Sequence, residues 1–328
     1  MNKQAKPQLS VCIPVYNLER YMEQCARSLF ESTLEDMEFL FLDDGSPDNS
    51  MKILENVIKD YPHRQHQIRL LRHEKNKGHV ETLKDLLTNA TGEYVITCDS
   101  DDWVEPDMYE KMYLKAKETQ ALIVACDHYK EVGKGRRKII HHCLGTQSKD
   151  VIKTWLTPNH PAYSWVTMAH HSIIEKLEYV PCGSAEDCVR VCQMLHYAGS
   201  NYAYIPEPLY HYRVEGQGFS SQRDVRSRIK THCIAYDWIT YFLHKKYGSH
   251  YDKELDMKKL FSKFWWCKYG IVPEFYDVWP EVNQLRLILE LPVAIERKTL
   301  LLLAYYRQKR LLDAALKVHD FLKTKYFF

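Results

Sequence analysis

Three aspartates stand close together at Asp99, Asp101 and Asp102, directly after the apolar run Tyr94–Thr97. Carboxylates this close repel one another, and the arrangement costs stability unless a cation or several hydrogen bonds compensate. Hard divalent cations such as Mg²⁺ and Mn²⁺ prefer oxygen ligands and often share them with the phosphates of a substrate. The motif is therefore compatible with a metal–phosphate site. It is equally compatible with an acidic turn that caps the helix expected from about Pro106.

Short apolar runs and helical patterns alternate through the first 126 residues. The runs have the composition of strands buried in a parallel sheet, and their strict alternation with helices predicts a doubly wound α/β domain with a mostly parallel sheet. The expected strands are Leu9–Pro14, Phe39–Leu42, Ile68–Leu71, Tyr94–Cys98 and Leu122–Cys126, and the expected helices are about Glu19–Glu31, Ser50–Tyr61, Val80–Asn89 and Pro106–Glu118.

Polar segments follow four of these strands. They are Pro14–Asn17, Asp43–Asn49, His73–Gly78 and Asp99–Trp103. Ligands of such sheets bind beyond the carboxyl ends of the strands, so we expect the four segments to meet at one rim.

The pattern changes toward the C-terminus. The segment Gly133–His142 is expected to be a loop or hairpin, followed by a helix over about Ala185–Tyr197 and a strand at Tyr202–Ile205. Beyond that strand, helical patterns rich in Tyr, Trp, Leu and Lys continue to the end of the sequence. We predict an α/β domain over residues 1–220 and a helical C-terminal region over residues 221–328.

The composition is that of a globular protein, with 45% hydrophobic and 27% charged residues. The 45 basic and 43 acidic residues leave a net charge of +2, so no nucleic-acid partner is expected. Ten scattered cysteines without a C-x-x-C pair are typical of a reducing compartment. The first residues lack the apolar core of a leader, and no apolar stretch is long enough to span a membrane. We expect a cytoplasmic protein whose contact with a membrane, if any, is peripheral.

Two of the polar segments contain candidates for binding a nucleotide base. Gly45 permits a tight turn, and the acids before it are not required for that turn. A carboxylate at this point could accept a hydrogen bond from N3–H of uracil. Tyr16 could lie flat against the base, although an aromatic residue beside a turn is more often simply packed.

Four ordered motifs strengthen this interpretation. They are SVCIPVYN (residues 10–17), LDDGSPDNS (42–50), NKG (76–78) followed by ATGEYV (90–95), and CDSDDWVEP (98–106). Together they resemble the family-2 glycosyltransferases of the bacterial polysaccharide and lipopolysaccharide type, which have the GT-A fold. Four motifs in order are strong evidence where one alone would be weak. The acidic run then resembles the D-x-D motif of the family, and the metal site becomes the favoured interpretation.

The resemblance implies roles for the rim residues. The nucleotide-sugar site would comprise Pro14, Val15, Tyr16, Asn17, Asp44, Gly78, Asp99, Ser100, Asp102 and Arg213. Within it, Asp44 would bind the uracil and Asp99 the ribose or the sugar. Asp101 would ligate the Mn²⁺ or Mg²⁺ that bridges the diphosphate. Asp102 would support the metal ligand or bind the donor sugar. Next to this site, the glycine-containing loop Val214–Arg223 could close over the donor with Arg213 or Arg223 paired to the diphosphate, or it could be an ordinary surface loop.

A second acidic site, Glu186 with Asp187, stands at the start of a predicted helix. Ser184, three residues before Asp187, approximates a capping box, which is the structural alternative. The family carries its catalytic base in a Glu-Asp pair at a helix start in this region. The resemblance therefore implies that Asp187, beside Glu186, takes the proton of the acceptor hydroxyl in an inverting displacement. We favour the base over the cap, and one residue could serve as both.

The sequence departs from the family at Leu83, where members often carry an arginine that helps to order the site. Either Lys84 or His79 compensates for this arginine, or the contact is absent.

These observations predict a metal-dependent hexosyl- or N-acetylhexosaminyltransferase that uses a UDP-sugar and a glycan or lipid-linked saccharide acceptor. The alternative is a non-catalytic nucleotide-sugar-binding scaffold or sensor that binds a partner through its helical region. A nucleotidyltransferase is disfavoured because the first turn after a strand lacks the glycine- and lysine-rich loop for a triphosphate. Aromatic residues interleaved with cations in the C-terminal helices suggest packing, a homodimer or peripheral contact with the inner face of the cell membrane.

Overall fold

The computed structural model describes residues 6–133, 135–142, 150–158, 160, 163–214, 225–268, 273–308 and 310–317. The chain forms two compact units, Met1–Val151 with Ala162–Arg223 and Ile152–Pro161 with Asp224–Phe328. The second unit thus includes a short segment from the middle of the chain, which the sequence had assigned to the first region. The roles assigned to the two regions stay predictions.

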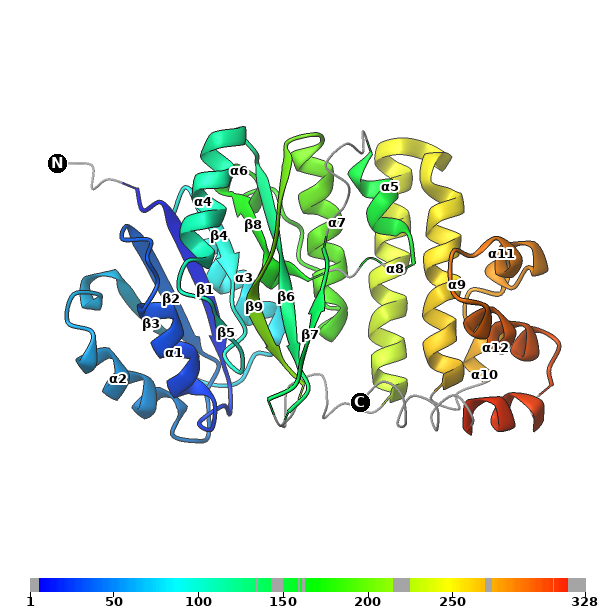
Figure 1. Ribbon diagram of the computed structural model, residues 1–328, viewed down its shortest axis with the longest axis horizontal. Coiled ribbons are helices and arrows are strands. Elements are labelled where there is room, and N and C mark those ends of the chain that lie inside the picture. The colour runs from blue at the N-terminus through cyan, green and yellow to red at the C-terminus, as the bar shows by residue number, and fades with distance from the viewer. Residues whose placement is uncertain are drawn as a thin grey trace. The chain divides into compact units, whose positions relative to one another are not determined.

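The first unit is built on one mixed sheet with the strand order β3-β2-β1-β4-β8-β6-β9-β5 (Figure 1). β1 (Leu9–Val15) pairs in parallel with β2 (Met37–Asp43) and with β4 (Tyr94–Thr97). β2 in turn pairs in parallel with β3 (Ile68–Arg72). These four strands confirm the predicted parallel half of the sheet, and the polar segments after them leave it at one edge.

Helices cover both faces of this sheet because alternate side chains of each strand point to opposite faces. In β1, Val11 and Ile13 pack into one hydrophobic core and Cys12 packs into the other. The first core contains side chains of α1 (Met22–Phe30), α2 (Ser50–Asp60) and α4 (Met108–Thr119), and the second contains side chains of α3 (His79–Asn89), α6 (His171–Ile174) and α7 (Glu186–Ala198). The predicted doubly wound α/β architecture is confirmed.

The remaining strands extend the sheet past β4. β8 (Thr167–His170) lies between β4 and β6 (Ile123–Glu131) and is antiparallel to both. β6 pairs in parallel with β9 (Tyr202–Arg213), which is antiparallel to β5 (Trp103–Val104). β7 (Arg137–Ile140) forms a hairpin with β6. The sequence predicted β6 and gave the segment that contains β7 as a loop or hairpin, of which the hairpin is correct, but it did not predict β5 or β8.

Gly92 lies where the segment before β4 passes close to the start of β1. A Cβ at this position would lie 2.5 Å from the backbone nitrogen of Ser10 and 2.8 Å from the backbone carbon of Leu9. We therefore expect Gly92→Ala to lower the free energy of unfolding by about 1–3 kcal/mol, the usual cost of overpacking. Urea denaturation measures the change. Thr91→Ala, at the exposed neighbouring position, is the control, and equal stability of Gly92→Ala and the parent would contradict the close approach.

The second unit is helical, as predicted for the C-terminal region. Its elements are α5 (Val151–Leu156) from its second residue, α8 (Val225–Tyr247), α9 (Asp252–Lys268), α10 (Pro273–Asp277), α11 (Leu285–Glu290) and α12 (Ile295–Tyr305). Short 3-10 helices are found at Gly248–Tyr251 and Pro280–Val282 in this unit, and at Gln65–Gln67 in the first.

A buried lysine holds part of this unit together. The ammonium of Lys263, on α9, donates to the carbonyl oxygens of Phe275 and Trp279 and to Oδ1 of Asn283, at distances between 2.8 and 3.0 Å. Burial lowers the pKa of Lys263 to about 8. One side chain thus fixes the segment from α10 to Asn283 against α9.

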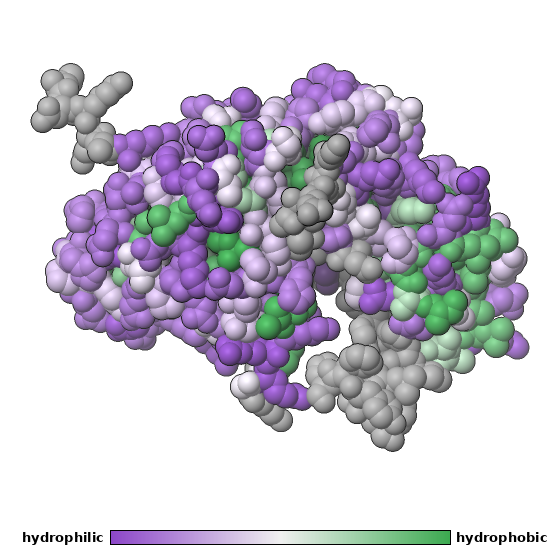
Figure 2. Space-filling view, turned by 45° about the horizontal axis from the view of Figure 1, so that its top comes forward, coloured by the Kyte–Doolittle hydropathy of each residue, from purple (hydrophilic) through white to green (hydrophobic). Residues whose placement is uncertain are grey.

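Hydrophobic side chains are also exposed on this unit. Leu289 of α11 is 54% exposed and Ile295 of α12 is 75% exposed. Figure 2 shows hydrophobic residues gathered on this part of the surface. None of the helices in the described ranges is long and apolar enough to cross a membrane. Peripheral membrane contact and a homodimer stay predictions.

Candidate active site

The acidic loop follows directly after β4. Asp99, Asp101 and Asp102 each contribute a carboxylate oxygen, and these oxygens lie within 4.8 Å of one another. The loop turns back on itself because the N–H of Asp102 donates to the carbonyl oxygen of Asp99 at 3.1 Å. The three acids singled out in the sequence therefore form one cluster.

The electrostatics of this cluster favour a cation. Burial, followed by repulsion from Asp101, raises the pKa of Asp99 to about 7. Burial also raises the pKa of Asp101, and burial together with both neighbouring acids raises that of Asp102 well above its usual range. A divalent ion would neutralise charge that the solvent reaches poorly, and an all-oxygen set of donors suits Mg²⁺ or Mn²⁺. The residues present fit such an ion.

Asp102 attaches the acidic loop to β9. Its Oδ2 accepts a hydrogen bond from the hydroxyl of Tyr210 at 2.8 Å, and its Oδ1 accepts one from the N–H of Arg213 at 2.7 Å. The same hydroxyl of Tyr210 accepts from the N–H of Asp99 at 3.2 Å. Asp102 is 1% exposed and both of its oxygens already have donors, whereas Asp99 and Asp101 are partly exposed, so these two are the acids more open to a ligand.

The guanidinium of Arg213 also contacts this loop. Its Nε donates to the carbonyl oxygen of Asp101 at 2.9 Å, and its Nη2 donates to Oε1 of Gln24 at 2.6 Å. Its central carbon lies 4.6 Å from the centre of the Trp103 ring and 4.9 Å from that of Tyr21. These contacts hold the acidic loop in place. The contact between Arg213 and a diphosphate stays a prediction, and the alternative residue Arg223, with residues 215–222 of the predicted loop, lies outside the described residues.

Hydrogen bonds to backbone carbonyl oxygens join the first rim loop to the acidic loop and to the second rim loop. The hydroxyl of Ser100 donates to the carbonyl oxygen of Pro14 at 2.6 Å. The N–H of Asp44 donates to the carbonyl oxygen of Val15 at 2.9 Å. The predicted meeting of these segments at one rim therefore rests on direct contacts.

Tyr16 and Asn17 form the turn after β1. Tyr16 is 45% exposed, so its ring is open to a ligand. Asn17 adopts a left-handed conformation with φ of 57°, and its N–H donates to the hydroxyl of Ser46 at 3.3 Å. The turn is therefore tied to the loop after β2.

Asp44 is bonded to the third rim loop. Its Oδ1 accepts from the N–H of Lys77 at 2.8 Å and from Nδ1 of His73 at 2.7 Å, and its Oδ2 accepts from the N–H of Gly78 at 2.9 Å. Gly78 has φ of 89°, a backbone conformation that favours glycine, and it precedes α3. A carboxylate offers about four lone-pair sites, so Asp44 keeps about one for another donor. Its contact with uracil stays a prediction.

Asp187 lies in the first turn of α7, after a 3-10 helix at Gly183–Ala185. Its Oδ1 accepts from the N–H of Ser164 at 3.2 Å, from the hydroxyl of Ser164, and from Nη2 of Arg190 at 3.2 Å. Within the described part of the chain, no group donates to Oδ2, so this oxygen is available to a substrate. No side chain caps the start of α7, so the capping-box alternative is wrong.

Glu186 and Asp187 have different environments. Oε1 of Glu186 accepts from Nη2 of Arg190 at 3.0 Å and lies 3.7 Å from Nε2 of His79. Burial alone would raise the pKa of Glu186, but Arg190 and His79 outweigh burial, and the net pKa is lowered. Burial and repulsion from Glu186 raise the pKa of Asp187. The surroundings thus move the pKa values of the two carboxylates apart. The carboxylate with the lowered pKa stays ionised, and the one with the raised pKa is suited to exchange a proton.

Sequence reasoning missed Ser164, Tyr210 and Arg190. Ser164 begins a 3-10 helix, Ser164–Val166, and Tyr210 lies on β9, so only the fold brings them to the acids. Arg190 could have been found from the sequence. It follows Asp187 by three positions and Glu186 by four, and residues at these spacings share one face of a helix. At the departure noted in the sequence, Leu83 is buried.

A doubly wound sheet with this strand order, and a cluster of acids after its fourth strand, defines the class of GT-A glycosyltransferases. The family model "Glycosyl transferase family 2" matches residues 10–177, about half of the chain. The chain belongs to glycosyltransferase family 2, as the four motifs indicated.

Comparison with individual proteins agrees with this assignment. The chain is 28% identical to EpsH of Bacillus subtilis (strain 168) over 259 residues, which are 76% of this chain and 73% of EpsH. It resembles residues 1–349 of S. aureus TarS, solved with UDP-GlcNAc, with a TM-score of 0.65 at 16% identity over 95% of this chain and 91% of that one. The mannosyltransferase PcManGT of Pyrobaculum calidifontis, solved with GDP-Man and Mn²⁺, gives a TM-score of 0.56 at 15% identity over 98% and 88%. These structures share the fold.

Proposed function

We propose that this glycosyltransferase moves a hexosyl or N-acetylhexosaminyl group from a UDP-sugar to a hydroxyl of a glycan or lipid-linked saccharide, with a divalent cation and with inversion. The observation that carries the proposal is the closeness of the two acidic sites. The hydroxyl of Thr97, two residues before Asp99, lies 3.4 Å from the hydroxyl of Ser164, which in turn donates to Oδ1 of Asp187. Two sites so close can hold the leaving diphosphate at one and the attacking hydroxyl at the other.

In this proposal Asp101, with Asp99 beside it, holds the divalent cation. The cation, when bound, neutralises the negative charge that develops on the departing UDP. Asp102 and Arg213 keep the acidic loop in position through their bonds to β9 and to Asp101. The presence of Mn²⁺ in the PcManGT structure supports this assignment.

The nucleotide lies on the rim between the first three loops. Tyr16 stacks on the base, and Asp44 accepts the N3–H of uracil through its remaining lone pair. The backbone of Pro14, Val15, Asn17, Gly78 and Ser100 shapes the surrounding surface. The TarS structure with UDP-GlcNAc supports a uridine donor.

Asp187 is the base in the proposed step. The acceptor hydroxyl gives its proton to Oδ2 of Asp187, and its oxygen forms a bond to the anomeric carbon of the donor sugar. The bond from that carbon to the diphosphate oxygen breaks, and its electron pair leaves with UDP. Because the hydroxyl attacks from the side opposite the leaving group, the configuration at this carbon is inverted.

A layer of aromatic rings supports a saccharide as the acceptor. Trp165 stacks on Tyr163 at 4.7 Å and on Tyr212 at 5.5 Å, with interplanar angles of 18° and 8°. Tyr163 and Tyr212 are half-buried. Tyr163 directly precedes Ser164, whose N–H and hydroxyl donate to Asp187, so Tyr163 belongs to the segment that contacts the base. Burial and the charge of Asp187 raise the pKa of Tyr163 to about 12. The flat layer suits the apolar face of a sugar ring.

We expect Tyr163→Ala to raise the KM for a saccharide acceptor by about 2- to 10-fold, since one aromatic contact contributes about 0.5–1.5 kcal/mol. The KM for the donor should change little. Initial rates at varied acceptor concentration measure the effect, and Tyr241→Ala, at a 61% exposed position of α8, is the control. A larger rise in the donor KM than in the acceptor KM would contradict an acceptor site here.

Release of UDP from common UDP-sugars, measured with and without Mn²⁺ and saccharide acceptors, tests the reaction and the donor together. We expect one UDP-sugar to give release that depends on Mn²⁺. No release from any of them would favour the non-catalytic scaffold.

We further infer that the enzyme acts in the cytoplasm, at the inner face of the cell membrane, in the synthesis of an envelope polysaccharide.

A further inference from the structure

We propose that Arg190 is a positioning residue for the base, holding one oxygen of Asp187 so that the other faces the acceptor hydroxyl. The inference rests on the proposed function and adds to it a residue outside every motif recognised in the sequence.

A single nitrogen of Arg190 links the groups around the base. Nη2 donates to Oε1 of Glu186 at 3.0 Å, to Oδ1 of Asp187 at 3.2 Å and to the hydroxyl of Ser164. Ser164 also donates to the same Oδ1 through its hydroxyl and its N–H. Rotation of the carboxylate would break these bonds together. The arrangement therefore keeps Oδ1 inside the protein and leaves Oδ2 as the oxygen that accepts a proton.

Arg190 also controls the charge at the base. The titratable and charged groups whose charges act on Asp187, or respond to it, are Glu186, Arg190, His79, Asp99, Tyr163 and Cys182. Arg190 lowers the pKa of Asp187, against the upward effects of burial and Glu186. Removal of Arg190 would therefore raise the pKa of Asp187, and the base would become protonated at a higher pH.

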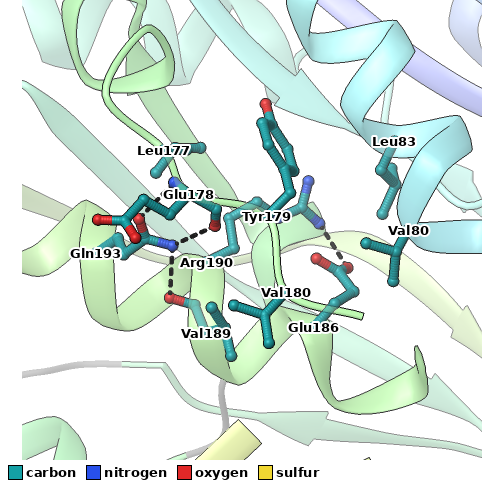
Figure 3. A pocket seen from close by; sticks show the side chains of 10 residues that line it. All are labelled: Val80, Leu83, Leu177, Glu178, Tyr179, Val180, Glu186, Val189, Arg190 and Gln193. Atoms are coloured by element: carbon teal, nitrogen blue, oxygen red, sulfur yellow. Dashed lines mark hydrogen bonds and ion pairs between the residues drawn. The ribbon is translucent and has the colours of Figure 1, made fainter. Parts of the chain in front are cut away.

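The position of Arg190 also bears on the departure at Leu83. Figure 3 shows that Leu83 and Val80 of α3 line the same pocket as Arg190 and Glu186 of α7. At Leu83, where family members often carry an arginine, this side of the pocket is therefore lined by apolar side chains. The guanidinium beside the Glu-Asp pair comes from α7.

A purely stabilising role explains these contacts poorly. Burying an arginine with two carboxylates removes hydration from all three ions, which largely cancels the gain from their attraction. In the part of the chain that the structure describes, Nε of Arg190 is buried without a hydrogen-bond partner, which is a further cost. The geometry points instead to the orientation and protonation of Asp187 as the benefit.

The test compares Arg190→Met and Arg190→Lys with Arg64→Met. Arg64 is a matched control because it is also buried in the first unit, where it donates to the carbonyl oxygens of Phe30 and Ser32. UDP release with Mn²⁺ from UDP-glucose, UDP-galactose and UDP-N-acetylglucosamine, with water or a saccharide as acceptor, gives kcat, the donor KM and the pH profile. Thermal denaturation shows whether each variant is folded.

We expect Arg190→Met to lower kcat by about 100-fold, the size of effect that a mispositioned base produces. The donor KM should stay within about threefold of the parent value, and the acidic limb of the kcat profile should move to higher pH. Arg190→Lys should restore the position of the acidic limb and part of kcat, because it returns the charge without the planar group. Arg64→Met should lower the melting temperature and leave the acidic limb unchanged.

Three outcomes would overturn the inference. A folded Arg190→Met variant with the kcat and acidic limb of the parent would do so, and so would equal losses of kcat in Arg190→Met and Arg64→Met. If the parent releases no UDP from any donor, the proposed function fails and this inference fails with it. If the parent is active and Asp187→Asn is inactive while Arg190→Met behaves like the parent, only the role of Arg190 fails.

Discussion

Asp187→Asn is expected to lower kcat for sugar transfer by about 100-fold or more, the range of general base catalysis. Asparagine has nearly the same shape, and its carbonyl oxygen can still accept hydrogen bonds from Ser164 and Arg190 in the place of Oδ1. Its amide nitrogen then occupies the position of Oδ2 and does not accept a proton. UDP release in the presence of a saccharide acceptor measures the loss, and calorimetric titration with UDP and Mn²⁺ should show unchanged binding.

Asp60→Asn is the control for this substitution. Asp60 makes an exposed ion pair with Arg27 at 2.9 Å on the surface of the same unit, so its loss should leave kcat unchanged. Asp187→Asn with the kcat of the parent would exclude Asp187 as the base. Glu186, which the structure keeps ionised, would then be the next residue to test.

Asp101→Asn is expected to weaken Mn²⁺-dependent binding of UDP by at least about 10-fold and to reduce transfer to background. A neutral amide is a poorer ligand than a carboxylate for a hard cation, and changes at or next to metal ligands commonly cost about 10–100-fold in metal affinity. Removal of one negative charge also relieves the repulsion that raises the pKa of Asp99. The variant should therefore fold at least as well as the parent while it binds the metal less well.

Calorimetric titration of UDP with and without Mn²⁺ separates the two effects. The parent should bind UDP more tightly when Mn²⁺ is present, and the variant should lose most of that difference. Asp107→Asn, which removes a carboxylate paired with Lys111 on the surface, is the control. Equal dependence on Mn²⁺ in the parent and in Asp101→Asn would show that the cation binds elsewhere.

The sequence was sufficient for the part of the site that is built from consecutive residues. Asp99, Asp101 and Asp102 had to converge because they share one turn, and the three other polar segments had to join them because parallel strands end at one edge of a sheet. Short apolar runs located these strands correctly, because β1, β2 and β4 are buried on both faces and β3, although half-exposed at the edge of the sheet, still carries the apolar residues Ile68, Leu70 and Leu71. β8 escaped notice because its four residues, Thr167–His170, include no aromatic or β-branched hydrophobic residue, whereas β4, which is equally short, contains Tyr94, Val95 and Ile96.

Contacts between segments that are distant in the chain could not be predicted from the sequence. Asp102 differs from Asp99 and Asp101 because Tyr210 and Arg213, more than 100 residues later, donate to both of its oxygens. The separation of Glu186 from Asp187 likewise depends on Ser164 and His79, which approach from other elements. Neighbouring acids thus differ in function because they bond to different distant residues. Neither the spacing nor the composition of the sequence predicts which distant residue each acid will contact.

The hydrogen bonds among the rim loops also affect the thermodynamics of donor binding. The bonds from Ser100 to Pro14, from Asp44 to Val15 and from Gly78 to Asp44 order the loops by contacts within the protein. A nucleotide that binds here meets a preorganised surface, so little conformational entropy is lost by the backbone on binding. The entropic penalty of binding then falls mainly on the nucleotide itself, and rigid analogues of the nucleotide should gain more affinity than substitutions that stiffen these loops.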